Sequence, residues 1–154
     1  MAVISFTKVN LPWGCLGNMA PYPITYEGKV WPTSEALFQA LRFKDPDIRE
    51  EIRIQKSPMA AKMKAKKHRA SYMVVEPMSD EDIQNMRLCL KLKFTQHPGL
   101  KSRLMVTKGH TICEDIGKRR GSRHEFWGSY RNNENQWIGN NMLGKLLMEL
   151  RDSL

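Results

Sequence analysis

The segment from Trp31 to Phe43, which reads WPTSEALFQALRF, constrains the fold of this chain more than any other stretch. Trp31 precedes a proline and therefore avoids helical backbone angles, so the residues leading to it are expected to be extended. Thr33 and Ser34 are good N-cap candidates for a helix that follows at once. Apolar residues then recur at helical spacing: Leu37, Phe38 and Leu41. The segment predicts an extended strand that leads directly into a capped helix.

Polar residues form a second stripe along the same predicted helix. Glu35, Gln39 and Arg42 occupy positions i, i+4 and i+7, which lie along one side of an α-helix. An acid, an amide and a guanidinium aligned in this way could hold a polar, ring-containing ligand. The alternative is a capped helix whose polar side faces solvent, and the spacing taken alone favours that alternative.

Length and composition limit the class of protein. The chain has 154 residues, of which 41% are hydrophobic and 27% charged, as expected for one globular domain with a proper core. No apolar run approaches the ~20 residues that cross a bilayer, and residues 1–10 lack the apolar core of a signal peptide. We therefore expect a cytoplasmic protein without a membrane contact.

Cysteine and histidine are too scattered to predict a metal site. Cys15, Cys89 and Cys113 are odd in number and lack paired spacing, so we expect reduced thiols rather than disulfides or a zinc site. The four histidines are equally dispersed: His68, His97, His110 and His124.

The formal net charge of +9 at pH 7 indicates an anionic partner, such as nucleic acid, a nucleotide or another phosphorylated small molecule. Much of the charge lies in two basic runs, Lys62–Arg69 and Lys118–Arg123. Each run could contact phosphate, or could form a solvated face that aids solubility. Composition leaves both readings open, and it says nothing of the oligomeric state.

Caps, breaks and periodicity predict the remaining elements. Residues 2–8 predict a strand and residues 11–23 a loop, while Glu27-Gly28 joins two short extended runs in a hairpin. Helices are predicted from Ser34, over Asp47–Gln55, from Pro58, from Asp80, over Leu100–Met105 and over Met142–Arg151. The fold class is therefore α+β: one predominantly helical domain over residues 1–154, with a small antiparallel sheet or hairpin.

Three details of this assignment concern side chains and loops. In the helix that starts at Pro58, Met59 and Met63 are expected to face inward and the lysines outward. In the helix that starts at Asp80, Lys93 is expected to lie largely off the core stripe. Residues 117–135 are polar, basic and glycine-containing, and predict an irregular loop.

Four sequence blocks, in this order, resemble one family. They are Trp31-Pro-Thr-Ser-Glu35 with Phe38-Gln39-Ala40 and Phe43; Met86 with Lys93-Phe94; Phe126-Trp127-Gly128; and the Gly139–Arg151 block with Asn141, Leu143-Gly144 and Leu147-Met148. Over nearly its whole length the chain is similar to the NADAR (YbiA-like) family of N-glycosidases. Each block alone is moderately specific, whereas four in order within one domain are strongly so.

The resemblance implies a mostly helical α+β fold and cleavage of the C1′–N bond between a phosphorylated ribose and a base or amine. Known family substrates include early riboflavin-pathway intermediates and ADP-ribose attached to guanine, free or in nucleic acid. No metal or cofactor is implied. A fixed carboxylate suits this chemistry, because positive charge builds on the ribose as the nitrogen leaves.

The expected site residues follow from the matching positions. Glu35 is expected to be the catalytic carboxylate, with Arg42 and Lys66 as further catalytic candidates. Substrate contacts are expected from Asn18, Trp31, Gln39, Lys67, Trp127, Gly128, Asn141 and Arg151.

Arg42 stands where the family usually has a lysine, a suspected amine nucleophile. A guanidinium stays protonated and cannot form a Schiff base. Lys44 is turned about 200° around the helix from Arg42, so only Lys66 or Lys67 from the next helix could supply an amine. The chain could therefore hydrolyse directly, use a relocated lysine, or be a non-catalytic module that binds ADP-ribose, a nucleotide or nucleic acid through its basic face.

Overall fold

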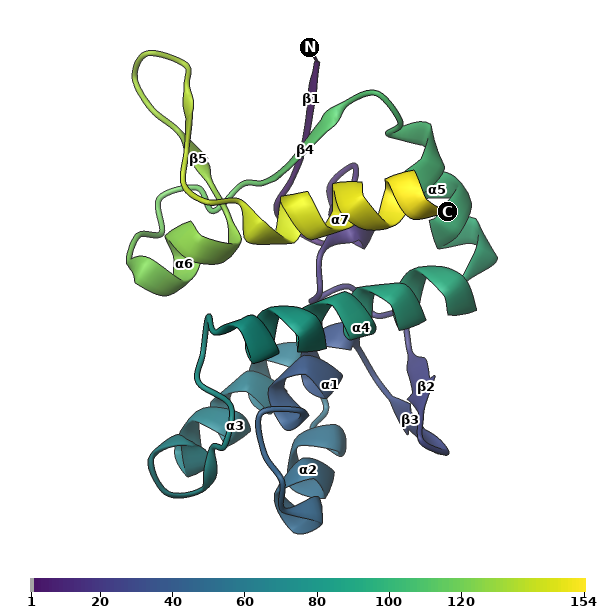
Figure 1. The fold of residues 1–154 in the computed structure, drawn as a ribbon, viewed down its shortest axis with the longest axis vertical. Coiled ribbons are helices and arrows are strands. Elements are labelled where there is room, and N and C mark those ends of the chain that lie inside the picture. The colour runs from purple at the N-terminus through teal and green to yellow at the C-terminus, as the bar shows by residue number, and fades with distance from the viewer. Residues whose placement is uncertain (1) are drawn as a thin grey trace. The chain divides into compact units, whose positions relative to one another are not determined.

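The computed structural model describes residues 2–154, which form an α+β arrangement dominated by helices (Figure 1). The helices are α1 (Ser34–Ala40), α2 (Pro46–Arg53), α3 (Pro58–Tyr72), α4 (Asp80–Gln96), α5 (Pro98–Val106), α6 (Ser122–Trp127), α7 (Met142–Ser153) and the 3₁₀ helix η1 (Gly14–Leu16). The strands are β1 (Val3–Phe6), β2 (Ile24–Tyr26), β3 (Lys29–Trp31), β4 (Thr111–Glu114), β5 (Tyr130–Arg131) and β6 (Trp137–Ile138). The predicted fold class is confirmed.

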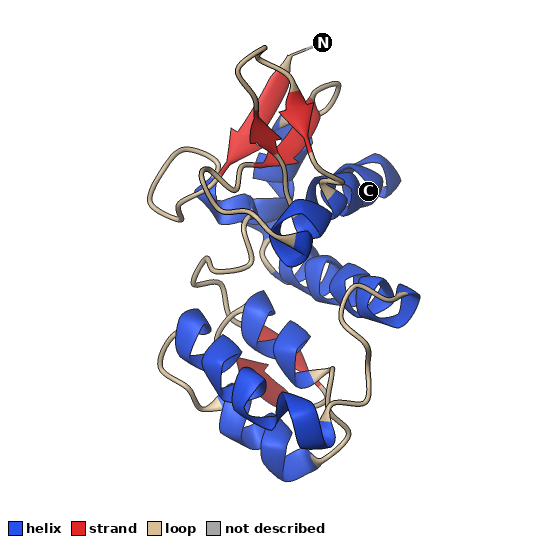
Figure 2. Cartoon of the chain, turned by 90° about the vertical axis from the view of Figure 1, so that its left-hand side faces the viewer, coloured by secondary structure: helices blue, strands red, loops and turns tan. Residues whose placement is uncertain are grey.

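The chain divides into two compact units, which are described separately. Unit 1 comprises Met1–Gly17 with Pro98–Leu154, and unit 2 comprises Asn18–His97. The sheets are two-stranded pairs rather than one continuous sheet (Figure 2).

Unit 2 contains the predicted hairpin and the helices α1 to α4. Strands β2 and β3 pair in antiparallel register, with Ile24 opposite Trp31. Glu27 and Gly28 both have positive φ angles, 49° and 77°, as a two-residue turn matched to the strand twist requires. Helices α1, α2 and α3 pack against one another, and α4 packs across α1 (Figure 1).

Helix α1 begins where the sequence predicts. The Thr33 hydroxyl accepts a hydrogen bond from the Ala36 amide at 3.1 Å, so Thr33 rather than Ser34 is the N-cap. All seven residues of α1 are buried. The solvent-facing alternative for its polar stripe is therefore wrong.

Two predictions about helix faces in unit 2 are wrong. Met59 and Met63 are 56% and 55% exposed, and α3 instead buries Ala61 and Ala65, whose small side chains permit close helix packing. Lys93 is fully buried, with its ammonium 5.7 Å from the Tyr22 ring centroid. An ammonium over an aromatic face, on a buried aliphatic stem, is compatible with an inward position that hydrophobic periodicity does not reveal.

Unit 1 is built on a pair of strands whose parallel pairing the sequence did not predict. Strands β1 and β4 pair in parallel, Ile4 lying opposite Ile112, and α7 packs against β4. Residues 117–135 are not wholly irregular, because they contain α6 and the strand β5. The amide of Gly121 donates to the Glu125 carboxylate at 3.0 Å and helps to start this short helix.

Gly144 sets the distance between α7 and β4. A Cβ atom added there would lie 2.2 Å from the Ile112 carbonyl oxygen, a backbone atom that cannot move aside cheaply. Gly144→Ala should therefore lower the free energy of unfolding by about 1–3 kcal/mol, measured by urea denaturation. Gly99→Ala is the matched control, because nothing lies within 4 Å of the added Cβ. Equal denaturation midpoints for the two variants would contradict the close approach.

Among residues 2–154, no helix is long and apolar enough to cross a membrane. Within the same residues, no group of three or more His, Cys, Asp or Glu side chains is placed to hold a metal ion.

Candidate active site

Asn18 fastens the start of α1 to α4 within unit 2. Its backbone oxygen accepts from the Glu35 amide at 3.3 Å, and its side-chain oxygen accepts from the Ser34 hydroxyl at 2.8 Å. Its side-chain NH₂ donates to the Met86 sulfur at 3.0 Å. The loop asparagine predicted only by a loose match is thus in direct contact with the first turn that carries Glu35.

A continuous hydrogen-bonded series, which we call the polar chain, joins Glu35 and Gln39 of α1 to Arg42, just after α1, and to Asp82 of α4. The Glu35 carboxylate accepts from Gln39 Nε2 at 3.2 Å, and Gln39 Oε1 accepts from an Arg42 NH group at 3.4 Å. Arg42 then donates to both Asp82 carboxylate oxygens, at 2.8 and 2.7 Å. None of the four residues is more than 8% exposed. The chain therefore fixes the Glu35 carboxylate through groups that are themselves buried.

Asp82 is the member of the polar chain that the sequence analysis missed. Its spacing from Ser79 suggested a capping box, and Ser79 does cap α4, with its hydroxyl accepting from the Asp82 amide at 3.3 Å. The Asp82 carboxylate, however, accepts from the Met78 amide at 2.9 Å and pairs with Arg42. The sequence carries only an indirect signal for Asp82. A buried arginine needs an acidic partner, but the position of Arg42 in the sequence does not identify which acid that is.

The Arg42 guanidinium is held on three sides. Besides Asp82 and Gln39, its central carbon lies 4.6 Å from the centroid of the Phe38 ring. A bidentate arginine–carboxylate pair is geometrically specific and charge-assisted. The position at which the family resemblance leads one to expect a lysine is thus occupied here by a cation whose geometry is fixed by a buried acid.

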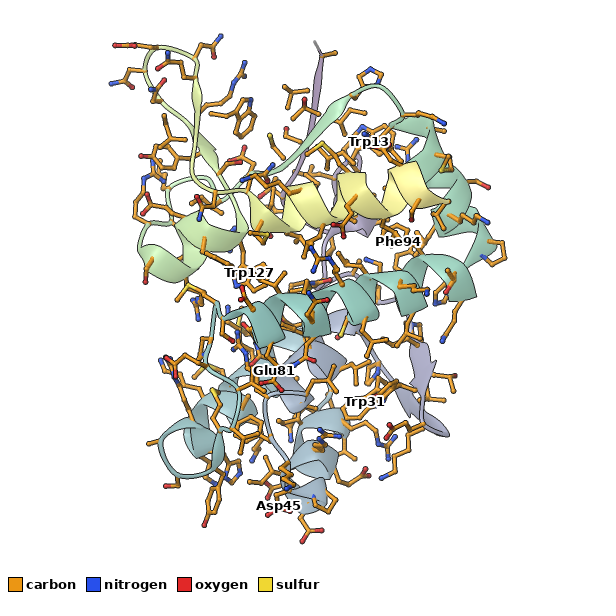
Figure 3. The ribbon with its side chains drawn as sticks, viewed as in Figure 1. Trp13, Trp31, Asp45, Glu81, Phe94 and Trp127 are labelled. Atoms are coloured by element: carbon orange, nitrogen blue, oxygen red, sulfur yellow. The ribbon has the colours of Figure 1, made fainter. Side chains whose placement is uncertain are left out.

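The predicted lysines lie elsewhere in unit 2. Lys66 and Lys67 are both exposed on α3, and Lys44 is exposed just after α1. Trp31 ends β3 and is 5% exposed (Figure 3). Within the described part of the chain, the Trp31 indole Nε1 is a buried side-chain donor without a hydrogen-bond partner. Such a donor costs about 1–3 kcal/mol unless something accepts from it.

Cys89 lies near the acids of the polar chain. Burial raises the pKa of its thiol well above the usual value, and the negative charges of Glu35 and Asp82 raise it further. Cys113, in unit 1, also has its pKa raised, chiefly by burial.

These pKa shifts predict selective thiol labelling. At neutral pH, Ellman's reagent should react quickly with the partly exposed Cys15 and slowly with Cys89 and Cys113, because a protonated, buried thiol is a poor nucleophile. Unfolding in guanidinium chloride should make all three react. Fast labelling of Cys89 in the native protein, located by peptide mass, would contradict the packing of α4 on α1.

Unit 1 brings together three other predicted residues. Trp127 ends α6, with its ring edge-on to Phe126 at a centroid distance of 5.0 Å. The Gly128 carbonyl accepts from the Asn141 amide at 3.0 Å, and a Cβ on Gly128 would lie only 2.4 Å from an Ile116 methyl group. A larger residue at position 128 would therefore force the Ile116 side chain to move.

Asn141 and Arg151 use their side chains within unit 1. Asn141 precedes α7 in the left-handed region (φ 52°), accepts from the Glu114 amide at 3.0 Å and donates to the Ile112 carbonyl at 2.8 Å. Arg151 donates to the carbonyls of Thr107 and His110, at 2.9 and 2.7 Å. Both residues tie α7 to its own unit.

The fold and the buried polar chain define an α+β protein with a fixed carboxylate in the first turn of a helix. It is similar to the NMR structure of the E. coli protein YbiA, with a TM-score of 0.79 and 35% identity, covering 99% of this chain and 84% of that chain. The model of the NADAR domain matches residues 5–154, so the chain belongs to the NADAR family.

Curated relatives agree with this assignment. The chain is 37% identical over 153 residues to N-glycosidase YbiA of Escherichia coli (strain K12), covering 99% of this chain and 88% of the relative. It is 31% identical over 166 residues to the riboflavin biosynthesis protein PYRR, chloroplastic, of Zea mays, covering 99% of this chain and 25% of that longer protein. The family resemblance predicted from the four sequence blocks is confirmed.

Proposed function

We propose that this protein hydrolyses the C1′–N bond of a phosphorylated ribosyl or ADP-ribosyl N-glycoside, with Glu35 as the catalytic carboxylate. Membership of the NADAR family and relatives named N-glycosidases support the class, a hydrolase acting on N-glycosyl bonds. The observation that carries the assignment of Glu35 is its place at the end of the buried polar chain, 3.2 Å from the Gln39 amide. The matched span supports treating residues 1–154 as one functional domain.

The chemistry follows from charge. As the C1′–N bond breaks, its electron pair leaves with the nitrogen and C1′ becomes cationic. A preorganised carboxylate in a site with little water stabilises that cation more strongly than bulk solvent would. Water then bonds to C1′, its proton passing to Glu35 or to the departing nitrogen. Gln39 keeps the carboxylate oriented and offers an amide to a ribose hydroxyl or base.

Arg42 supports direct hydrolysis rather than an imine route. Its guanidinium is paired with Asp82 and has no amine to offer, and its charge acts on the site through Gln39. We assign Lys66 and Lys67, which are exposed on α3, to phosphate contacts, with Lys66 kept as the candidate amine if an imine does form.

Imine trapping tests this choice. Incubation with substrate and sodium borohydride should give no covalent ribosyl adduct in the intact-protein mass spectrum, because direct hydrolysis forms no Schiff base. Borohydride trapping on a lysine-dependent N-glycosidase is the positive control. An adduct that maps to Lys66 or Lys67 would contradict direct hydrolysis and support an imine route through that lysine.

The other predicted residues are assigned roles within their own units. The buried, unpartnered indole N–H of Trp31 suits a ligand acceptor, which would remove the cost of the unsatisfied donor. In unit 1, Trp127 offers a ring for a base, and Gly128 lets the chain beside Trp127 pack against Ile116. Asn18, Asn141 and Arg151 act by positioning, since their side chains hydrogen-bond within their own units.

The activity is tested with a substrate panel. The panel contains riboflavin-pathway N-glycosides, NAD and ADP-ribosylated guanine in DNA, and released bases are measured by mass spectrometry. Release from one class identifies the substrate.

A second candidate is a non-cleaving module that binds ADP-ribose, a nucleotide or nucleic acid. The arginine at position 42 and its ion pair with Asp82 favour it, because a suspected nucleophile is absent there. Binding of ADP-ribose without release of any base from the panel would select this second candidate over the N-glycosidase.

A further inference from the structure

The second basic run lies on an exposed loop of unit 1. Lys118, Arg119, Arg120 and Arg123 are all exposed. No acidic residue occurs between positions 116 and 124 to neutralise them locally. This segment, residues 116–123, runs into the first turn of α6 and is called the basic loop.

The basic loop forms one wall of a surface cleft of about 560 Å³. The other wall comes from the two residues that follow β1, of which Lys8 adds a further cation. The cleft is lined by Thr7, Lys8, Ile116, Gly117, Lys118 and Arg119. Three of these six residues are cations and none is an acid, so the cleft attracts anions.

Four hydrogen bonds to backbone groups hold the basic loop in place. The Ile116 amide donates to the Ser129 carbonyl at 2.9 Å, and the Gly117 amide donates to the Asp115 carboxylate at 2.8 Å. Arg119 Nε donates to the Ile116 carbonyl at 3.0 Å, and Arg120 donates to the Gly117 carbonyl at 2.8 Å. Cations on an ordered loop lose less conformational entropy on binding than cations on a free one.

Aromatic rings adjoin the cations. The Arg120 guanidinium carbon lies 3.5 Å from the Tyr130 ring centroid, and that of Arg131 lies 5.7 Å from the Trp137 ring centroid. Tyr130 and Trp137 are only partly buried. Stacked guanidinium planes and aromatic rings are the platforms on which proteins receive unpaired bases.

We propose that unit 1 binds single-stranded nucleic acid along this surface. Lys8, Lys118 and Arg119 contact consecutive phosphates in the cleft, while a base stacks beside Arg120 and Tyr130. A duplex hides its base faces and would leave the platform unused. The inference does not depend on cleavage by Glu35.

The test is fluorescence anisotropy with a labelled single-stranded oligonucleotide. The variant Lys118→Gln/Arg119→Gln/Arg120→Gln should bind about tenfold or more weakly. Its salt slope should fall by about 1.4, because two of the three proposed phosphate contacts are lost. The matched control, Lys101→Gln/Lys108→Gln/Lys145→Gln, removes the same charge from exposed positions of unit 1 outside the cleft, and should bind much like the parent. Tyr130→Leu should weaken binding about tenfold with an unchanged salt slope.

Several results would overturn the proposal. If the two triple variants lose the same affinity, binding depends on net charge and not on the basic loop. If the parent binds duplex as tightly as single strands, the surface is not specific for single strands. If no salt-dependent binding is measured, the proposal that this surface binds nucleic acid is wrong. Thermal melts establish that each variant is folded. Release of base from a free glycoside should be unchanged in both triple variants. A failed binding test therefore does not contradict the proposed N-glycosidase activity, and an inactive enzyme does not contradict nucleic-acid binding.

Discussion

The Glu35→Gln variant should release base about 10²–10⁴ times more slowly than the parent protein while binding substrate almost as well. Glutamine keeps the shape of the side chain, and its Oε1 can still accept from Gln39 Nε2, so the polar chain remains joined. What the substitution removes is the negative charge that stabilises the cationic ribose. Turnover is measured by mass spectrometry of released base, and affinity by calorimetry with a slow substrate or product.

The matched control is Glu81→Gln, which makes the same chemical change one residue before Asp82. Glu81 is an exposed carboxylate in the first turn of α4 (Figure 3). Turnover should be unchanged in this variant. If Glu35→Gln also turns over normally, Glu35 has no part in the mechanism.

The Asp82→Ala variant should lose about 3–5 kcal/mol of unfolding free energy, because it leaves the buried Arg42 guanidinium without its counter-ion. The Met78 amide also loses its acceptor. Urea denaturation measures the loss. The comparison is Asp80→Ala in the same helix turn, where an exposed acid contributes only about 0.3–1 kcal/mol through the helix dipole.

A second substitution shows whether the stability lost in Asp82→Ala comes from an unpaired buried charge or from general disruption of packing. Adding Arg42→Met to Asp82→Ala removes the unpaired cation, so the double variant should recover much of the lost stability. If the double variant is less stable than Asp82→Ala alone, the lost stability comes from the missing ion pair and not from an unpaired buried arginine.

Local signals in the sequence predicted the elements that short-range interactions control. Proline after Trp31 and the Thr33 hydroxyl determine where α1 begins, and Glu27-Gly28 determines the β2–β3 turn. The wrong predictions concern residues whose environment is set by segments distant in the sequence. Residues 122–127 lie in a stretch expected to be irregular yet are helical, and Lys93 is buried although its type favours solvent.

The candidate site shows the same division. Glu35, Gln39 and Arg42 could be placed on one helix side from their spacing, because helical geometry alone aligns them. Whether that side faced water or the interior was not a local property, and α1 is buried all round.

The sequence by itself determined the family, the helix that carries Glu35 and the alignment of the acid, amide and guanidinium. Only the tertiary structure decided that Asp82, 40 residues from Arg42, closes the polar chain. The reason is physical: caps and turns depend on neighbours a few residues away, whereas a buried charge takes whichever opposite charge the folded chain brings within hydrogen-bonding distance.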